Sequence, residues 1–403
     1  MNLSGIRSLA DVEVDGKTVF VRVDFNVPLD GKTITDDARI RAALPTIQSL
    51  LERGAKVVLG SHLGRPGGVA DDRFSLEPVA SRLAELLEID VIFTDDCVGD
   101  GVKKVVRDAN AGEVILLENL RFHKAETKND PLFAKELASL ADVYINDAFG
   151  TSHRKHASTY AMVSHFPDDH VGMGLLVRRE LEFLTPLLYR ATRPYVAIMG
   201  GAKVSDKIKV IENLLGRVDH LLIGGAMAYT FLAAQNIGIG KSLVETDKID
   251  LARTLLARAE KSNTKIMLPL DHGVAPDFSS DDRTDTTGVH IPDDAIALDI
   301  GPETIEAFSE VIAKAKTIIW NGPLGLFERD AFNDGTFAVA NAVANNTEAL
   351  TVIGGGDSAA AIVAAGRAQD VSHVSTGGGA SLEYLEGAEL PGIAALRAGH
   401  LFR

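Results

Sequence analysis

The chain has a single cysteine, Cys97, among its 403 residues. One cysteine cannot form an intrachain disulfide, and such sparse use is typical of a reducing compartment, so we expect a cytoplasmic protein. Positive charge is also scarce, because 41 Lys and Arg stand against 56 Asp and Glu, for a net charge of -15. This balance argues against nucleic acid or an anionic membrane as the main partner, so any anion site must be a local basic cluster.

Long apolar runs are equally rare. Residues 1–17 are too polar for a signal peptide. The stretch Leu221 to Gly240 carries no charge, but its Gly, Tyr, Thr, Gln and Asn are typical of a buried strand-turn-helix unit. The pattern therefore disfavours a membrane span.

Several well-known site motifs are absent. Gly-Lys followed by Ser or Thr occurs three times, but the residues five positions earlier are Asp11, Asn26 and Gln235, where a Walker A loop requires glycine. The lack of G-x-G-x-x-G disfavours a nicotinamide-dependent dehydrogenase. The chain has neither an HExxH motif nor a cysteine cluster. The spacing of His153 and His156 is compatible with a metal, but flanking basic residues favour a place in an anion cluster.

The most informative stretch is YVAIMGGAKVSDKI, from Tyr195 to Ile208. An apolar strand runs into a glycine pair, and from Ala202 the pattern becomes helical, which predicts Lys203 and Lys207 on one helix face. Glycines allow close approach of an anion, and a helix start offers free N–H groups with a favourable dipole. An ordinary strand-to-helix turn with solvated lysines would give the same pattern, so this stretch alone leaves both interpretations open.

The same device recurs three times downstream. The segments read HLLIGGA from His220 to Ala226, TVIGGGDS from Thr351 to Ser358, and HVSTGGGAS from His373 to Ser381. Four such turns in one parallel sheet open at its carboxyl edge, where doubly wound folds bind ligands. Together they favour a nucleotide site.

Strands of the first half end in Arg, His and Asn where the second half has glycines. Predicted strands at Thr18 to Val23, Lys56 to Gly60, Glu113 to Leu117 and Val143 to Asn146 run into DFNVP, SHLGRP, ENLR and DAFGTSHR. Guanidinium groups bind small carboxylates and phosphates in a bidentate manner. A single arginine is more often a surface ion-pair partner, but four strand ends with the same chemistry favour an anion site.

The two halves are joined by an amphipathic stretch, Met173 to Tyr189, in which Pro186 either kinks the helix or closes an early one. We therefore predict an α/β protein of two Rossmann-like, doubly wound domains with parallel sheets, joined by an interdomain helix and a cleft.

These segments resemble one family. VFVRVDFNVP at Val19 to Pro28 is very similar to the signature of phosphoglycerate kinase, and SHLGRP, LLENLRF, VYINDAFGTSHR, GGAKVSDKI, WNGPLGLFE, GGGDS and STGGGASLEYLEG come after it in that family's order over essentially the whole chain. The resemblance implies a triose domain at 1–172, an interdomain helix at 173–189, a nucleotide domain at 190–388, and a segment at 389–403 that returns to the first domain. It also implies a monomer that transfers a phosphoryl group between 1,3-bisphosphoglycerate with ADP and 3-phosphoglycerate with ATP, with Mg2+ and hinge closure.

The resemblance also implies roles for individual residues. Those expected to bind the triose are Asp24, Phe25, Asn26, Arg39, His62, Leu63, Gly64, Arg65, Arg121 and Arg154. Those expected to bind the nucleotide are Gly201, Lys203, Lys207, Gly225, Asn321, Glu328, Gly355, Gly356, Asp357 and Ser358, with Asp357 as the Mg2+ ligand and Glu328 at the ribose. Catalysis is expected from Arg39, Lys203 and the backbone at Gly378 and Gly379. The attacking carboxylate has a pKa of about 3.5 and needs no general base at neutral pH.

Two features depart from the family pattern. Ala226 stands where many members have glycine, which adds a methyl group near the nucleotide, and the tail LRAGHLFR ends in apolar Leu401 and Phe402, which can change its docking. Two alternatives remain. Another small-molecule kinase is disfavoured by the Arg and His residues at the strand ends of the first half, and a non-catalytic nucleotide-binding protein by the retention of Arg39, Lys203 and Asp357.

Overall fold

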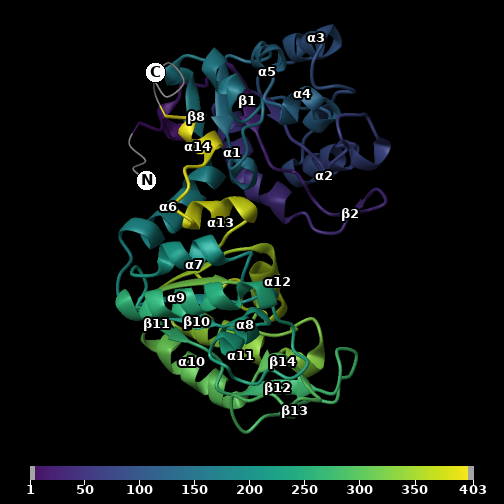
Figure 1. Ribbon diagram of the computed structural model, residues 1–403. Helices are drawn as coiled ribbons and strands as arrows, with labels where there is room; N and C mark the ends of the chain where they lie inside the picture. Colours follow the sequence, from purple (N-terminus) through teal and green to yellow (C-terminus); the bar gives the residue numbers. More distant parts are fainter. Residues whose placement is uncertain (1–4, 398–403) are drawn as a thin grey trace. The chain divides into compact units, whose positions relative to one another are not determined.

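The computed structural model describes residues 5–397 (Figure 1). Leu401 and Phe402, at which the tail departs from the family pattern, lie outside the described residues. The chain forms two compact units. The N-terminal unit contains residues 5–182 and 389–397, and the C-terminal unit contains residues 183–388.

The N-terminal unit is built on a six-stranded sheet in which every pair of neighbouring strands is parallel. Its strand order is β5-β6-β4-β1-β7-β8. The bounds are β1 Thr18–Arg22, β4 Lys56–Gly60, β5 Val91–Phe93, β6 Val114–Leu116, β7 Val143–Asn146 and β8 Val171–Met173. The four strands predicted in this half are confirmed to within one residue at each end.

Helices and a small hairpin complete this unit. The helices are α1 Ala38–Glu52, α2 Glu77–Leu87, α3 Asp100–Asp108, α4 Lys124–Thr127, α5 Pro131–Ala138 and α14 Pro391–Ala394, and the hairpin strands are β2 Leu29–Asp30 and β3 Thr33–Ile34. Ile47 of α1 and Leu83 of α2 join Val21 and Leu59 of the sheet in one buried cluster. Residues 389–397 attach through Gly392, whose N–H donates to the Ser152 carbonyl at 2.8 Å.

The C-terminal unit contains a second all-parallel sheet, in the order β11-β10-β9-β15-β16-β17. The bounds are β9 Tyr195–Met199, β10 His220–Ile223, β11 Lys265–Met267, β15 Thr317–Asn321, β16 Leu350–Ile353 and β17 His373–Val374. Renumbered from one to six, this order is 3-2-1-4-5-6, the order of the dinucleotide-binding doubly wound fold. A three-stranded antiparallel sheet adds β12 His272–Ala275, β13 Thr284–Asp285 and β14 Ile296–Ile300.

The helices of this unit are α7 Ile208–Leu214, α8 Met227–Ala234, α9 Ile249–Lys261, α10 Pro302–Lys314, α11 Asp334–Asn345, α12 Gly356–Ala364 and α13 Gly379–Leu385. Trp320 of β15 is fully buried among Phe308 of α10 and Val339 of α11. Two parallel-sheet α/β units confirm the predicted fold class. The uncharged stretch Leu221 to Gly240 contains most of β10 and all of α8, so the strand-helix interpretation is confirmed. Within residues 5–397 no helix combines the length and apolar character needed to cross a membrane.

The predicted connector is the helix α6, Leu175–Tyr189, and the division between the two units falls inside it, after Glu182. Pro186 lies within the helix and does not end it. At its start, the Asp147 carboxylate accepts the N–H groups of Leu176 at 2.9 Å and Val177 at 3.3 Å. This acidic cap fixes the first turn of α6 to the end of β7.

One local prediction was wrong. Helix α7 begins at Ile208, so Lys203 and Lys207 lie on the loop before it and do not share a helix face. The chain leaves Gly201 at φ +110°, which a helix does not allow. Ser205 is then held away from the helix by Glu245, whose carboxylate accepts both its N–H and its hydroxyl.

Candidate active site residues

The basic strand ends of the N-terminal unit meet at the carboxyl edge of its sheet. Asp24 follows β1 and is 8% exposed, and Arg39 lies in the first turn of α1. The Arg39 Nη1 atom donates to Asp24 Oδ2 at 2.8 Å, and His62 Nε2, after β4, lies 3.9 Å from Asp24 Oδ1. Residues that follow two strands are thereby brought together with one from a helix. The strand-end pattern placed Asp24 and His62 at this edge, and the family resemblance added Arg39.

Two further contacts join three strand ends around Gly64. The Gly64 N–H donates to Asn26 Oδ1 at 2.8 Å, and its carbonyl accepts Arg121 Nη1 at 2.8 Å. Phe25 and Leu63 are buried, so their side chains pack into the core beneath the surface of these loops. Their contribution to a ligand would therefore come from the backbone.

A cavity of about 470 Å³ opens beside these loops. Its lining is basic and glycine-rich, and comprises Arg65, Pro66, Gly67, Gly68, Arg121, Thr127, Arg154 and His156. Arg65 and Arg154 are exposed, so their guanidinium groups are available to a small anion. Three of the four predicted arginines line this cavity, whereas Arg39 pairs with Asp24.

The electrostatics of this region are those of an anion site. Burial, followed by the nearby Arg22 and Arg121, holds the pKa of His62 well below its usual range. Burial and then Arg121 lower the pKa of His156 to about 3. Burial, together with Arg22, also lowers the pKa of Arg121 to about 10. Neutral histidines among several guanidinium groups leave excess positive charge for a ligand to neutralise.

Sequence reasoning missed a buried network behind this cavity. Arg22, at the end of β1, is fully buried and donates through Nε to Ser158 Oγ at 2.8 Å. Ser158 in turn donates through Oγ to the buried carboxylate of Glu126 at 2.6 Å. The signal was a charged residue inside the apolar run VFVRV, but Ser158 and Glu126 lie more than 100 positions from Arg22 and have no local pattern.

In the C-terminal unit, the ends of the neighbouring strands β15 and β16 carry the polar set. Asn321, fully buried at the end of β15, accepts the Lys207 ammonium through Oδ1 and donates through Nδ2 to the Gly354 carbonyl at 2.6 Å. Ser358 Oγ donates to the same carbonyl at 2.9 Å. Burial lowers the pKa of Lys207, and Asp357 partly opposes this effect. These contacts bring together three predicted residues, Lys207, Asn321 and Ser358, around the carbonyl of Gly354, which precedes the predicted Gly355.

The start of helix α12 has the features of an anion site. Gly355 precedes the helix at φ +92°, and an added Cβ at Gly356 would meet nothing within 4 Å. Asp357 is exposed in the first turn, and in the described part of the chain its carboxylate has no hydrogen bond or ion pair. Free N–H groups and open space at this turn suit a phosphate, and the uncommitted carboxylate suits a cation.

The glycine turns after β9 and β10 serve packing, where the sequence pattern predicted an anion site. A Cβ on Gly200 would lie 2.0 Å from the Pro323 carbonyl oxygen, and one on Gly225 would lie 2.7 Å from the Gly201 nitrogen. The N–H groups of Gly200, Gly201 and Gly225 all donate to backbone carbonyls. These glycines allow three strand ends to pack against one another, and their N–H groups are not available to an anion.

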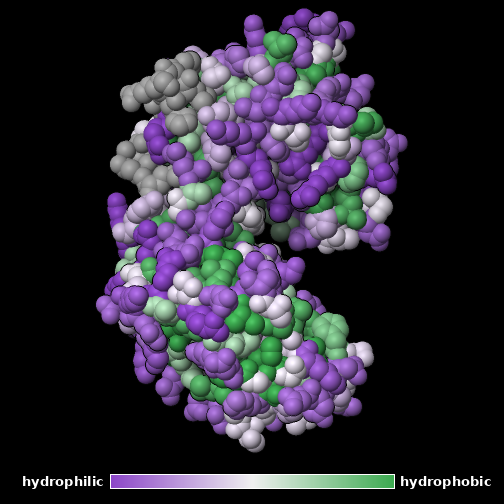
Figure 2. Space-filling view, in the orientation of Figure 1, coloured by the Kyte–Doolittle hydropathy of each residue, from purple (hydrophilic) through white to green (hydrophobic). Residues whose placement is uncertain are grey.

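The remaining predicted residues are accessible to solvent and do not take part in the contacts described above. Lys203, Glu328 and Gly379 are exposed, and within residues 5–397 the side chains of Lys203 and Glu328 form no hydrogen bond or ion pair. Gly378 precedes α13 at φ +51° with open space around it. Figure 2 shows hydrophilic residues over most of the visible face of the N-terminal unit, while apolar residues gather on the C-terminal unit in the area where Figure 1 labels α8.

Comparison with known proteins identifies the family. The family model described as phosphoglycerate kinase matches residues 9–388. Among curated relatives, the phosphoglycerate kinase of Anaeromyxobacter sp. (strain K) is 56% identical over 395 residues, which are 97% of this chain and 99% of that protein. That of Acidobacterium capsulatum is 54% identical over 400 residues, covering 96% of this chain and 98% of the relative.

Solved structures agree with the sequence relatives. The phosphoglycerate kinase of Coxiella burnetii matches with a TM-score of 0.88 and 40% identity, covering 98% of this chain and all of that one. The enzyme of Pyrococcus horikoshii OT3 gives a TM-score of 0.86 at 35% identity, again over 98% of this chain and all of the other. A full-length match in sequence and in fold means that the chain belongs to the phosphoglycerate kinase family, and that it is a kinase.

Proposed function

We propose that this chain carries out the family's reaction, the reversible transfer of a phosphoryl group between 1,3-bisphosphoglycerate with ADP and 3-phosphoglycerate with ATP, through two residue sets on its two units. The observation that carries the proposal is the cluster of Arg65, Arg121 and Arg154 around a 470 Å³ cavity, next to the Arg39–Asp24 pair. Such a cluster binds a small dianion, whereas a nucleobase would gain little from it.

In the N-terminal unit, Arg65, Arg121 and Arg154 bind the phosphate end of the triose. Asp24, Asn26 and His62 orient the remainder, with support from the backbone at Phe25, Leu63 and Gly64. His62 is held neutral, so it acts as a hydrogen-bonding group and adds no charge. Arg39 is directed to the carboxyl end that reacts, and its pairing with Asp24 positions it beforehand.

In the C-terminal unit, the start of α12 and the loop from Gly201 to Lys207 bind the nucleotide phosphates. Gly355, Gly356 and Ser358 form the turn at the start of α12. Lys203 and Lys207 contribute positive charge, and Asn321 positions Lys207. Gly225 shapes the neighbouring turn, and Glu328 binds the ribose. The uncommitted Asp357 carboxylate fits Mg2+, which prefers oxygen ligands and takes few of them from the protein. When bound with the nucleotide, Mg2+ neutralises phosphate charge.

The transfer itself needs alignment and charge neutralisation. The acceptor carboxylate, with a pKa of about 3.5, is already ionised near pH 7 and needs no base. Arg39 and Lys203 neutralise charge on the moving phosphoryl group, and the N–H groups at Gly378 and Gly379 donate to its oxygens. Each of these groups stabilises the transition state more than the separate substrates.

A coupled assay with 3-phosphoglycerate and Mg-ATP tests this function directly. We expect ADP formation that depends on both substrates and on Mg2+. Activity with a different carboxylate or alcohol acceptor, and none with 3-phosphoglycerate, would favour another small-molecule kinase. We also propose that the protein acts as a cytoplasmic monomer, which light scattering after gel filtration tests by its mass of 43.0 kDa.

A further inference from the structure

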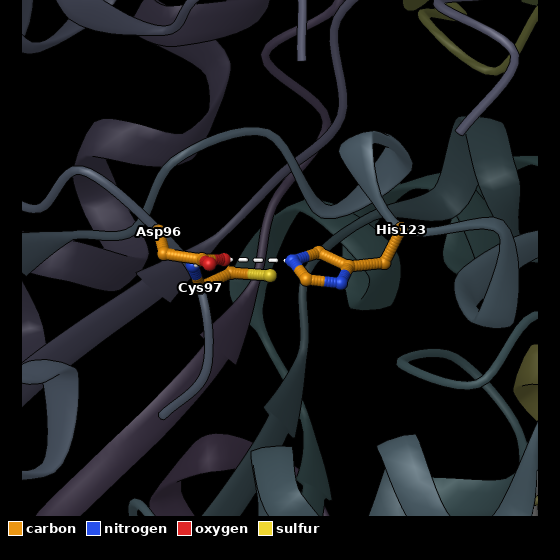
Figure 3. Close-up of side chains that lie close together, drawn as sticks. All are labelled: Asp96, Cys97 and His123. Carbon is orange, nitrogen blue, oxygen red and sulfur yellow. Dashed lines mark hydrogen bonds and ion pairs between the residues drawn. The ribbon is translucent and has the colours of Figure 1, made fainter. Parts of the chain in front are cut away.

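A second set of metal-binding side chains lies outside the residues assigned to the substrates. Within residues 5–397, Asp96, Cys97 and His123 are the group of His, Cys, Asp or Glu residues whose ligand atoms all lie within 4.8 Å of one another. Figure 3 shows the Cys97 sulfur and the Asp96 carboxylate directed toward the same edge of the His123 imidazole. None of these residues has a role in the proposed phosphoryl transfer.

The fold brings this group together from two loops. Asp96 and Cys97 follow β5, and His123 follows β6 after one short helical turn, Leu120–Phe122. Strands β5 and β6 are parallel neighbours, with Phe93 paired to Leu116, so their following loops leave the same edge of the sheet. The cluster is therefore a product of the sheet topology.

The side chains are also held in place. The Asp96 carbonyl accepts the Thr94 hydroxyl at 2.6 Å, and Asp96 Oδ1 accepts the Cys97 N–H at 2.6 Å. The His123 ring stacks on Phe133 at 5.2 Å between ring centroids, with an interplanar angle of 29°. Its Nε2 lies 2.7 Å from Asp96 Oδ1. A fixed ring and a fixed turn reduce the entropy lost when both sides bind one ion.

We propose that Asp96, Cys97 and His123 form a binding site for a thiophilic divalent ion of the Zn2+ class, with water at the fourth position. A sulfur, an imidazole nitrogen and a carboxylate oxygen are the three ligand types that Zn2+ takes. Mg2+ takes oxygen ligands almost exclusively, so this site is chemically distinct from the nucleotide's cation site.

The three ligand atoms are close enough together to bind one tetrahedral ion after small movements. With Zn–S near 2.3 Å and Zn–N near 2.0 Å, ligand atoms stand about 3.3 to 3.8 Å apart. The ligand atoms lie within 4.8 Å of one another, so the longest separation needs a contraction of at most about 1.5 Å, while the 2.7 Å contact between Asp96 and His123 opens by about 0.6 Å. The side chains of Asp96 and His123 are 52% and 32% exposed, so an ion can enter from solvent, and the more exposed Asp96 carboxylate can turn to accommodate it while the His123 ring stays stacked on Phe133.

Binding couples to deprotonation of the thiol. Cys97 is buried, and burial together with Asp96 and Glu126 raises the pKa of its thiol well above the usual value. The ion must therefore displace the thiol proton to solvent as the Cys97 sulfur becomes a thiolate ligand. Thiolate and carboxylate charges then balance the two positive charges of the metal, with His123 as a neutral ligand.

The experiment uses the full chain, freed of metal with a chelator and titrated with Zn2+ in competition with a chromophoric chelator. A parallel titration with Co2+ follows the near-ultraviolet charge-transfer band that a thiolate ligand produces. We expect one ion per chain, the charge-transfer band, and no displacement by excess Mg2+. Cys97→Ser should abolish the band and weaken Zn2+ binding at least about tenfold.

Two further variants separate the site from nonspecific binding. His123→Gln should also weaken Zn2+ binding at least about tenfold, while His165→Gln, an exposed histidine of the same unit, should leave it unchanged. Circular dichroism verifies that each variant is folded. The proposal is overturned if Co2+ gives no thiolate band with the wild-type chain, or if Cys97→Ser and His123→Gln both bind Zn2+ as tightly as the wild type.

Discussion

Arg39 is the residue whose removal best tests the proposed chemistry. Its guanidinium pairs with Asp24 of the same unit, and its proposed task is to stabilise charge on the transferring phosphoryl group. We expect Arg39→Ala to lower kcat by a factor of several hundred, because one preorganised charge stabiliser contributes about 3 to 4 kcal/mol to the barrier. Nucleotide affinity, measured by calorimetry with ADP, should remain near the wild-type value.

The matched control for this variant is Arg41→Ala. Arg41 lies on the same helix, is 53% exposed and pairs with Asp37. Its loss removes the same charge without touching the proposed site, so turnover should remain within about twofold, as expected for an exposed ion pair. If Arg39→Ala retained a third of wild-type turnover, Arg39 would have no catalytic role.

Asp357 is the residue through which the cation is tested. Its carboxylate is exposed at the start of α12, and in the described part of the chain it has no bonding partner. Asp357→Asn should weaken binding of Mg-ADP and leave binding of 3-phosphoglycerate unchanged, because Mg2+ is held by few protein carboxylates. Calorimetry with each ligand measures both effects, and Glu310→Gln, an exposed position on α10, controls for the lost charge. Unchanged Mg-ADP affinity in Asp357→Asn would place the cation elsewhere.

Two buried groups of the N-terminal unit give opposite pH dependences of stability. Burial lowers the pKa of His156 to about 3, so below pH about 6.5 the unfolded chain binds a proton that the folded protein does not, and the free energy of unfolding falls. Burial raises the pKa of Asp147 to about 6, so between pH 6 and about 4 the folded protein holds the extra proton and its contribution rises as pH falls. Each group changes the stability by at most about 1.4 kcal/mol per pH unit.

Urea unfolding at pH 7 and pH 5 separates the two contributions. On acidification, His156→Gln should lose less stability than the wild type, because the variant no longer has the buried neutral imidazole. Asp147→Asn should lose more, because the variant no longer gains a proton at this position. Equal losses in the wild type and both variants would show that neither group has the shifted pKa.

At the scale of the elements, local pattern is sufficient to predict the strands and insufficient to predict the loops after them. Tyr195 to Met199 is an apolar run bounded by Pro and Gly, and β9 has these bounds. The helical spacing of Ala202 to Ile208 predicts a helix in the loop after β9, whereas Ser205 is captured by Glu245, 40 residues away. A local sequence pattern cannot reveal a partner that lies so far away in the chain.

The residues of the candidate site also divide into those that a local sequence pattern reveals and those that depend on distant contacts. His62 and Arg121 could be found because each follows a strand whose end is visible in the sequence, whereas Arg39 lies in the first turn of α1 and was found through the family resemblance. Arg22 and Glu126 could not, since their common partner is Ser158 and the contact exists only in the folded sheet. The glycine turns were located correctly, but their packing role at Gly200 depends on the distant Pro323.

Two glycines of the C-terminal unit should respond in opposite ways to an added methyl group. Gly225 has φ +64°, and a Cβ there would lie 2.7 Å from the Gly201 nitrogen, so Gly225→Ala should destabilise the fold by about 1 to 3 kcal/mol. Gly356 is helical with open space, so Gly356→Ala should stabilise it by about 0.5 to 1 kcal/mol. Thermal unfolding measures both changes.

Nucleotide binding adds a second readout for Gly356. The methyl group that improves the helix would stand at the α12 turn, where the phosphates are proposed to approach the backbone, so Gly356→Ala should weaken ADP binding. A more stable variant that binds ADP as tightly as the wild type would contradict the assignment of this turn to the phosphates.

At the scale of the whole molecule, the proposed triose ligands belong to one compact unit and the proposed nucleotide ligands to the other. The acceptor carboxylate and the phosphoryl donor must approach to about 3 Å in line before transfer can occur. Each substrate alone has its proposed contacts on a single unit, so neither alone favours a closed arrangement, whereas both together do. We therefore expect small-angle scattering to give a smaller radius of gyration with 3-phosphoglycerate and Mg-ATP together than with either alone or with none.

Two variants test whether this decrease in the radius of gyration depends on the proposed ligand contacts. Asp357→Asn should not become compact at substrate concentrations that close the wild type, because its nucleotide is bound weakly, and higher nucleotide should restore closure. Arg41→Ala should behave as the wild type. Because closure requires both ligands, the decrease in radius should follow the occupancy of the second ligand added, whichever is added first. A ligand-free chain already as compact as the ternary complex would contradict closure, and the assignment of the two substrates to different units would then have to change.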